Sequence, residues 1–392
     1  MAPFLPPFDN GGVYRPVSWL KYSIKNNWQA TVLTRPFEGE PSAAGKYLMK
    51  HLPGDVKILR VNYSSLRPAW NLFPRTDGNF INAISSVSKC YQAWKDSPPA
   101  VVVATGPSFD LFITAFYLSK IFRAKLVLDY RDEWTLSPFT NVIIDNADSY
   151  WEKRCLKNAD KVIFTTKDMM QYHQHHFKGL IDSKSCVLHN GWDPDDLALN
   201  MNDEIRNGHD QKHVIMYAGT LGDATLPGHF LKDFGKILED QDALRKKFKI
   251  HIIGTQVPAA LSQLRSFPFH ENLLVEGNFP KDISNKMIRK SNILLLFVPP
   301  NYRRISAKLF EYIASGKPII IHGVKSECSN IVTELDAGYF VEENDPGALA
   351  QALQEIASSP LTRWNNSKRE KWVMEHTREN LAKKFYDILE NL

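Results

Sequence analysis

The chain has 392 residues, of which 43% are hydrophobic and 23% are charged. This length exceeds what one ordinary hydrophobic core accommodates, so we expect two domains of roughly 150–200 residues each. The formal net charge of +5 is a small excess for this length. It suits an anionic small substrate or an acidic membrane surface, and it argues against a nucleic acid as the binding partner.

The cysteines and the hydropathy pattern indicate a reducing compartment. No pair of cysteines has the spacing typical of a zinc or redox site, and no run reaches the roughly 18 apolar residues of a membrane span. The N-terminus also lacks the pattern of a secretory signal. We therefore expect a cytoplasmic protein whose four cysteines are free thiols: Cys90, Cys155, Cys186 and Cys328.

Predicted strands and helices alternate through the first half of the chain. A strand candidate at 1–5 runs into a loop of prolines and glycines that contains Gly11 and Gly12. Because such a strand usually has about five or six residues, it looks clipped, and we expect the native chain to begin upstream of Met1. Strands are predicted at 28–33, 56–61, 100–104, 125–129, 161–165 and 185–188, and helices around 17–24, 80–93, 109–122, 149–157 and 168–176.

A second alternation follows a polar stretch with little periodicity, which we interpret as a linker at 196–212. We predict an N-terminal domain at 1–195, a C-terminal domain at 213–368 and a terminal helical segment at 369–392. The strands of the second half are predicted at 213–218, 248–253, 273–276, 293–298 and 338–341, and the helices at 227–239, 258–266, 281–290, 346–356 and 370–392.

Strictly alternating strands and helices favour an α/β fold with parallel, doubly wound sheets. In such sheets the functional loops lie at the carboxyl ends of the strands. We therefore expect two Rossmann-like domains, and two such domains facing each other would place a ligand-binding cleft between their strand ends.

Basic and aromatic residues gather in two regions of the first half. One lies around Lys21, Lys25 and Trp28, and the other is the loop 64–79, which contains Trp70. Both are candidates for a peripheral contact with the inner face of a membrane. The loop could instead bind an acceptor or simply cover the edge of its domain.

The segment 303–321 combines a loop, a helix, a turn and a strand. Ser306 is placed to cap a helix of about nine residues that begins at Ala307, and Gly316 with Pro318 ends it. At 100° per residue this helix has an apolar face and a charged face. The apolar face holds Leu309, Phe310 and Ile313, and the charged face holds Lys308, Glu311 and Ser315.

Lys308 and Glu311 allow two interpretations. Near a helix N-terminus the backbone dipole favours an anion such as phosphate, and a lysine there would strengthen the binding. The simpler interpretation is a surface helix with an ion pair between these two side chains, three positions apart.

Three further groups of residues could carry chemistry. Gly11 and Gly12 permit close backbone approach to a phosphate or sugar, although the G-x-G-x-x-G dinucleotide fingerprint is missing. Asp132 follows a predicted strand and could position a hydroxyl or take its proton, unless it only forms a structural ion pair. His173 and His176 could share a helix face, but no carboxylate stands at ligand spacing, so no metal site is predicted.

Five motifs, in this order, resemble those of GT-B glycosyltransferases, and the set is most similar to the retaining family 4. The resemblance covers nearly the whole chain, and the last motif is the most specific. The motifs are Pro6-Pro7 with Gly11-Gly12, Asp129-Tyr-Arg-Asp-Glu-Trp134, Asn190-Gly-Trp-Asp193, Tyr217-Ala-Gly-Thr220, and the segment 306–318.

The resemblance implies a nucleotide-sugar donor held mainly by the C-terminal domain and a glycan or lipid-linked acceptor held by the N-terminal domain. It implies retention, no cofactor, no obligatory metal, and a terminal helix that packs back on the N-terminal domain. The expected pathway is the synthesis of a surface polysaccharide or glycoconjugate.

The resemblance also implies roles for single residues. Glu311 matches the glutamate that bonds the donor ribose hydroxyls, and Lys308 with the amides after Ser306 would neutralise the diphosphate. The loop of Gly11 and Gly12 would approach the phosphate and the reacting sugar. Asp132 is the candidate catalytic residue on the acceptor side.

Two departures from the family pattern change this expectation. Arg303 stands eight positions before Glu311, where the family often has a glutamate, and the loop 221–227 lacks the usual phosphate-binding cations. We therefore expect Arg303 and Arg304, with Lys308, to bind the diphosphate or an acidic donor sugar. A GT-B nucleotide-sugar epimerase and a non-catalytic nucleotide-sugar-binding protein remain as alternatives.

Overall fold

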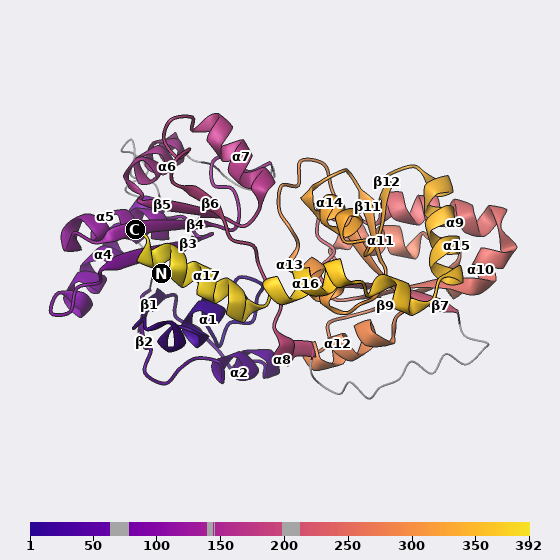
Figure 1. The fold of residues 1–392 in the computed structure, drawn as a ribbon, viewed down its shortest axis with the longest axis horizontal. Helices are drawn as coiled ribbons and strands as arrows, with labels where there is room; N and C mark the ends of the chain where they lie inside the picture. Colours follow the sequence, from indigo (N-terminus) through magenta and orange to yellow (C-terminus); the bar gives the residue numbers. More distant parts are fainter. Residues whose placement is uncertain (63–77, 139–143, 145, 198–211) are drawn as a thin grey trace. The chain divides into compact units, whose positions relative to one another are not determined.

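The computed structural model describes residues 1–62, 78–138, 144, 146–197 and 212–392 (Figure 1). The chain divides into two compact units. Unit 1 holds Met1–Asn190 together with Arg378–Leu392, and unit 2 holds Gly191–Thr377. Most of the predicted linker, at 198–211, and most of the predicted loop 64–79 lie outside the described residues.

Within its described residues, unit 1 has a four-stranded parallel sheet in the order β3-β4-β5-β6 and a parallel pair of β1 and β2. The strands are β1 (Thr31–Thr34), β2 (Lys57–Arg60), β3 (Val101–Gly106), β4 (Lys125–Tyr130), β5 (Lys161–Phe164) and β6 (Ser185–Val187). The helices are α1 (Tyr14–Lys21), the 3₁₀ turn η1 (Ile24–Asn26), α2 (Ala43–Met49), α4 (Gly78–Trp94), α5 (Asp110–Phe122), α6 (Asn146–Asn158), α7 (Lys167–His176) and α17 (Arg378–Glu390).

The first residues of the chain join these two sheets. The Ala2 amide donates to the Leu33 carbonyl at 3.0 Å, and the Thr105 amide donates to the Met1 carbonyl at 3.1 Å. The segment predicted as a first strand thus lies between β1 and β3, although it is too irregular to be assigned as a strand. With this segment counted first, the seven strands follow the order 3-2-1-4-5-6-7, which adds one strand to the 3-2-1-4-5-6 order of a doubly wound fold.

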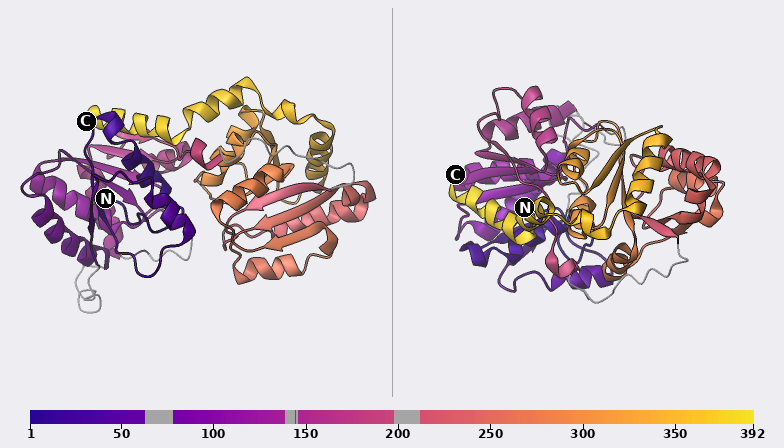
Figure 2. Two further views of the ribbon diagram at one scale, coloured as in Figure 1. Left: turned by 90° about the horizontal axis from the view of Figure 1, so that it is seen from below. Right: turned by 45° about the vertical axis from the view of Figure 1, so that its right-hand side comes forward.

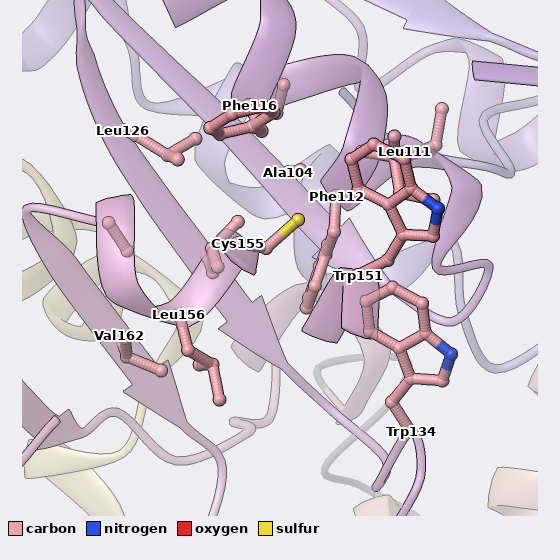
Figure 3. Packing of buried hydrophobic residues seen from close by; sticks show 14 of the residues in the cluster. Ala104, Leu111, Phe112, Phe116, Leu126, Trp134, Trp151, Cys155, Leu156 and Val162 are labelled. Carbon is pink, nitrogen blue, oxygen red and sulfur yellow. The ribbon is translucent and has the colours of Figure 1, made fainter. Parts of the chain in front are cut away.

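Alternate residues of β4 point to opposite faces of the sheet. Leu126 and Leu128 pack with α5 and α6 in the cluster that Figure 3 shows in part. Val127 packs on the other face against α17, where Phe385 stacks on Trp19 of α1 with ring centroids 4.1 Å apart. The last helix of the chain therefore covers one face of the sheet in unit 1.

A fully buried carboxylate lies under the loop that follows β4. Glu152 on α6 accepts hydrogen bonds from the Tyr130 hydroxyl at 3.0 Å and from the Thr135 amide at 3.1 Å, and the Thr135 hydroxyl also donates to it. Burial nevertheless raises the pKa of Glu152 to about 7, and the charge of Asp148 adds to the rise. Below that pH the folded protein keeps this side chain protonated.

The stability of unit 1 is expected to fall by about 3 kcal/mol as the pH rises from 4.5 to about 7. The folded pKa lies above the ordinary value, so in this window the folded chain holds a proton that the unfolded chain has released. Glu152→Gln should flatten this part of the pH profile, whereas Glu390→Gln at an exposed position should preserve it. Urea unfolding at several pH values measures the slope, and an unchanged slope in the Glu152 variant would contradict the assignment.

Unit 2 has, in its described part, one six-stranded parallel sheet in the order β12-β11-β10-β7-β8-β9. The strands are β7 (His213–Ala218), β8 (Phe248–Ile253), β9 (Leu273–Glu276), β10 (Ile293–Val298), β11 (Ile319–Gly323) and β12 (Gly338–Glu342). The helices are α8 (Pro194–Leu197), α9 (Gly228–Asp240), α10 (Asp242–Lys247), α11 (Pro258–Arg265), α12 (Lys281–Lys290), α13 (Ala307–Ala314), α14 (Glu327–Glu334), α15 (Pro346–Ser358) and α16 (Ser367–Glu375), with 3₁₀ turns η2 (His270–Asn272) and η3 (Leu361–Trp364).

The central strand β10 is buried on both faces, as expected for a parallel sheet covered by helices. Ile293, Leu295 and Phe297 pack with α9, α11 and α15, and the alternate residues of the strand pack with α12, α13 and α14. Figure 2 shows the helices around this sheet from two further directions. The α/β class and the two Rossmann-like domains predicted from the sequence are confirmed.

The C-terminal segment differs from its prediction. We expected one helix at 370–392, but the chain forms α16 and α17 with a break at His376 and Thr377. The break has a structural cause, because Trp192 pairs with Thr377 and its amide donates to the His376 carbonyl at 3.2 Å. α16 packs on α13 in unit 2, whereas α17 belongs to unit 1. Within the described ranges, no helix is long and apolar enough to cross a membrane.

Candidate functional site

The strand order of unit 2 places a topological switch point between β7 and β10. Chain connections run from β7 toward β9 on one side and from β10 toward β12 on the other. In open α/β sheets, ligands bind at the carboxyl ends of the strands at such a point. The loop after β10 leads here into α13. Lys308 and Glu311 lie on this helix, and Arg303, Arg304 and Ser306 precede it.

Lys308 reaches from α13 across the switch point to the end of β7. Its ammonium donates to the Tyr217 hydroxyl at 3.0 Å and lies 4.3 Å from the centre of the Tyr217 ring. Gly219 makes this approach feasible, because a Cβ atom there would lie 2.2 Å from Lys308 Cε. Its φ of +132° is also one that other residues rarely adopt. The cation is therefore fixed beside the exit of the first strand of the unit.

Glu311 pairs with a residue that the sequence analysis missed. Lys281, the first residue of α12, lies with its ammonium 2.9 Å from Glu311 Oε1. Of the two interpretations, the ion pair between Lys308 and Glu311 on one helix is wrong, because each side chain binds a partner on another element. Residues 30 positions apart give no local pattern from which the Lys281 contact could be predicted.

The predicted cap at Ser306 is correct in position and wrong in chemistry. Ser306 is the N-cap residue of α13, but its side chain makes no capping hydrogen bond. Its carbonyl oxygen instead accepts from the Leu309 amide at 2.9 Å. Ala307 in the first turn is exposed, so the start of the helix is open to solvent.

Arg303 and Arg304 lie in the loop between β10 and α13, and both are half-buried. One guanidinium nitrogen of Arg303 donates to the Asn301 carbonyl at 3.3 Å, and the Arg304 carbonyl accepts from the Cys328 thiol at 3.6 Å. The two arginines therefore stand in the sequence directly before the open helix start, in a loop tied to its surroundings by backbone contacts.

The remainder of α13 is held firmly. The predicted apolar face is confirmed, since Leu309, Phe310 and Ile313 are fully buried. At the C-terminal end, the buried guanidinium of Arg369 donates to the carbonyls of Ile313, Trp364, Tyr312 and Lys317 at 2.8–3.0 Å. Burial lowers the pKa of Arg369 to about 10, yet the side chain stays cationic at neutral pH and offsets the negative end of the helix dipole.

Gly11 and Gly12 follow the N-terminal segment, and Asp132 follows β4. These residues lie near a second switch point, between the N-terminal segment and β3. The guanidinium of Arg131 donates to the carbonyls of Gly12, Gly106 and Pro107 at 2.8–2.9 Å. Gly12 is required for this contact, because a Cβ atom would lie 2.8 Å from the guanidinium, whereas nothing lies within 4 Å of that position at Gly11. Asp132 follows Arg131 and is half-buried.

A buried ion pair under this loop was not predicted. Arg15 of α1 donates to both carboxylate oxygens of Asp129 at 2.7–3.2 Å, and the Thr105 hydroxyl donates to the same carboxylate at 2.6 Å. Arg15 also donates to the His189 carbonyl at 2.9 Å. Asp129 is therefore buried and already bound by Arg15 and Thr105. Asp132 is the more accessible acid of this motif.

Residues 212–359 match the family described as Glycosyl transferases group 1. The C-terminal domain of this chain belongs to the group 1 glycosyltransferases. The matched region contains Lys281, Lys308 and Glu311. A similar curated protein, the D-inositol 3-phosphate glycosyltransferase of Geodermatophilus obscurus, is 23% identical over 269 residues. The alignment covers 64% of this chain and 54% of that relative, so the chain matches about half of the relative's length.

Solved structures of other proteins share the fold over the whole chain. A glycosyltransferase from Rickettsia africae is 16% identical with a TM-score of 0.69, and each chain is covered completely. The Anabaena protein HepE, solved in complex with UDP, is 14% identical with a TM-score of 0.65 and 99% coverage of both chains. The chain therefore has the two-domain GT-B fold that its motifs predicted.

Proposed function

We propose that the protein transfers a sugar from a nucleotide-sugar donor to a glycan or lipid-linked acceptor, with retention and without a metal or another cofactor. The observation that carries the proposal is the placement of Lys308 and Glu311 on one short helix at the switch point of unit 2. The group 1 match over the same residues supports it, as does the UDP in the HepE structure.

The chemistry of this edge suits a nucleoside diphosphate. The amides of the first turn of α13 and the ammonium of Lys308 would bind the diphosphate, and Glu311 would accept hydrogen bonds from the ribose hydroxyls. When the diphosphate leaves, the sugar becomes oxocarbenium-like and negative charge grows on the leaving group. A cation held in place before the reaction stabilises that charge without reorganisation.

On the side of unit 1, we propose Asp132 as the residue that positions or deprotonates the acceptor hydroxyl. Gly11 and Gly12 would bring backbone amides against the donor, and Arg131 holds their loop. We also propose that the protein acts in the cytoplasm, in the synthesis of a surface polysaccharide or glycoconjugate. A peripheral membrane contact near Lys21, Lys25 and Trp28 is part of the same proposal.

Binding and turnover assays test the function. UDP, GDP and ADP are titrated into the purified chain by calorimetry, and the sugar nucleotide of the tightest binder, starting with UDP-glucose, is then followed by NMR. The acceptor probes are inositol phosphate and a bacterial lipid extract. Acceptor-dependent loss of the donor with a new glycosidic linkage supports transfer, and absence of binding to all three diphosphates contradicts the proposal.

The same assays separate the alternatives. An epimerase would change the sugar of the nucleotide without any acceptor. A nucleotide-sugar-binding protein would bind the diphosphate and leave both donor and acceptors unchanged over long incubation.

Arg303→Ala is expected to weaken nucleoside diphosphate affinity by about tenfold and to lower turnover, since one guanidinium beside a diphosphate contributes roughly 1.4 kcal/mol. The arginine takes the place of an acid that is often present in the family, so it should bind the phosphates or an acidic donor sugar. Arg265→Ala, at an exposed position on α11, is the matched control. Affinity and turnover that both equal those of the wild type would exclude Arg303 from the site.

A further inference from the structure

The ion pair between Lys281 and Glu311 connects two elements that meet at the proposed donor site. Lys281 begins α12 directly after the loop at the carboxyl end of β9, and Glu311 lies in the second turn of α13. α12 packs against β7, the strand whose exit also carries Tyr217 and Gly219. The pair therefore sits on the same edge of the sheet as the contact between Lys308 and Tyr217.

The two oxygens of Glu311 have different surroundings. Oε1 lies 2.9 Å from the Lys281 ammonium, and in the described part of the chain Oε2 has no hydrogen-bond partner. The exposed fractions of the two side chains are 19% for Glu311 and 23% for Lys281. The carboxylate is thus sheltered, held by one oxygen, and still open to a ligand that brings hydroxyl donors.

A glutamate side chain has three rotatable bonds, and holding it in one rotamer costs conformational entropy. A contact that fixes the carboxylate before the ligand arrives removes this cost from the binding step.

We propose that Lys281 is a positioning residue for the donor: it holds Glu311 so that the carboxylate can accept both ribose hydroxyls. The inference rests on the proposed function of this site. Lys281 acts through Glu311 and needs no contact with the reacting sugar.

The test compares a ribonucleoside diphosphate with its 2′,3′-dideoxy form. Lys281→Met keeps the length of the side chain and removes its charge, and Lys290→Met on the exposed end of the same helix is the control. The ligand is the tightest binder among UDP, GDP and ADP, with affinities measured by calorimetry and folding checked by thermal unfolding. Lys281→Gln is a second variant in case the methionine variant does not fold.

We expect the Lys281 variants to bind the ribonucleoside diphosphate about tenfold more weakly and the dideoxy form within twofold of the wild type. Lys281→Arg should restore most of the loss, since arginine can form the same ion pair. An equal loss for both ligands would assign Lys281 to the phosphates, and unchanged or tighter binding would show that it does not help the carboxylate. Either result overturns only the inference about Lys281. A wild-type protein that binds no nucleoside diphosphate overturns the proposed function as well.

Discussion

Replacing Glu311 with alanine is expected to lower kcat/KM for donor turnover by about 10²- to 10⁴-fold. Hydrogen bonds to a charged group contribute roughly 1.5–3 kcal/mol each, and the variant would lose two of them to the ribose hydroxyls. It would also leave the ammonium of Lys281 without its carboxylate at 2.9 Å. The effect on the fold should be small, because Glu311 lies at the surface edge of α13 while the opposite face of the helix is buried.

Two companion variants make this test specific. Glu311→Gln keeps the shape of the side chain and should lose part of the activity, since a neutral amide accepts hydrogen bonds less strongly. Glu334→Ala, at an exposed position on α14 of the same unit, should behave as the wild type. Donor turnover is measured as initial rates over a range of donor concentrations. Full activity of the Glu311 alanine variant would remove this residue from the donor site.

Local signals were sufficient to predict α13 and its apolar face. Ser306 marks the start of the helix, Gly316 adopts a φ of +73° after its last turn, and Pro318 prevents its continuation. The spacing of Leu309 and Ile313 indicates the buried face because it repeats once per helical turn. Features that depend on the nearest few residues were therefore accessible from the sequence.

The contacts that complete the candidate site depend on distant residues and could not be predicted in this way. Lys308 binds Tyr217, 91 positions away, and Arg369 holds the end of α13 from 56 positions away. Ser306 shows the same limit at short range, since its hydroxyl had the right position for a cap and yet makes no capping bond. Which partner a polar side chain binds is decided by packing that brings separate elements together.

The motif that runs from Asp129 to Trp134 is a further example. The sequence analysis selected Asp132 from this motif, and the structure adds that Asp129 is fully buried and bound by Arg15. The position along the strand explains the difference. Asp129 lies within β4, which is covered on both faces, whereas Asp132 follows the end of the strand. The proposed role of Asp132 thus depends on the position of the end of β4, which the ion pair between Asp129 and Arg15 helps to stabilise.

Breaking this buried ion pair is expected to destabilise unit 1 by about 3–5 kcal/mol, because the remaining charge would be buried without its partner. In Arg15→Met, the Thr105 hydroxyl would be the one donor left to the carboxylate of Asp129 among the described residues, and the His189 carbonyl would lose its bond to Arg15. Lys153→Met at an exposed position on α6 should change the stability by less than about 0.5 kcal/mol.

A double-mutant cycle separates the ion pair from simple loss of packing. Asp129→Asn should cost about as much as Arg15→Met, since it leaves the guanidinium buried without a carboxylate. The double variant should be destabilised by clearly less than the sum of the two single variants, because it contains no buried charge without a partner. Urea unfolding followed by tryptophan fluorescence provides the four free energies. Additive losses would show that the two side chains stabilise unit 1 independently, and that the end of β4 before Asp132 is not held by their ion pair.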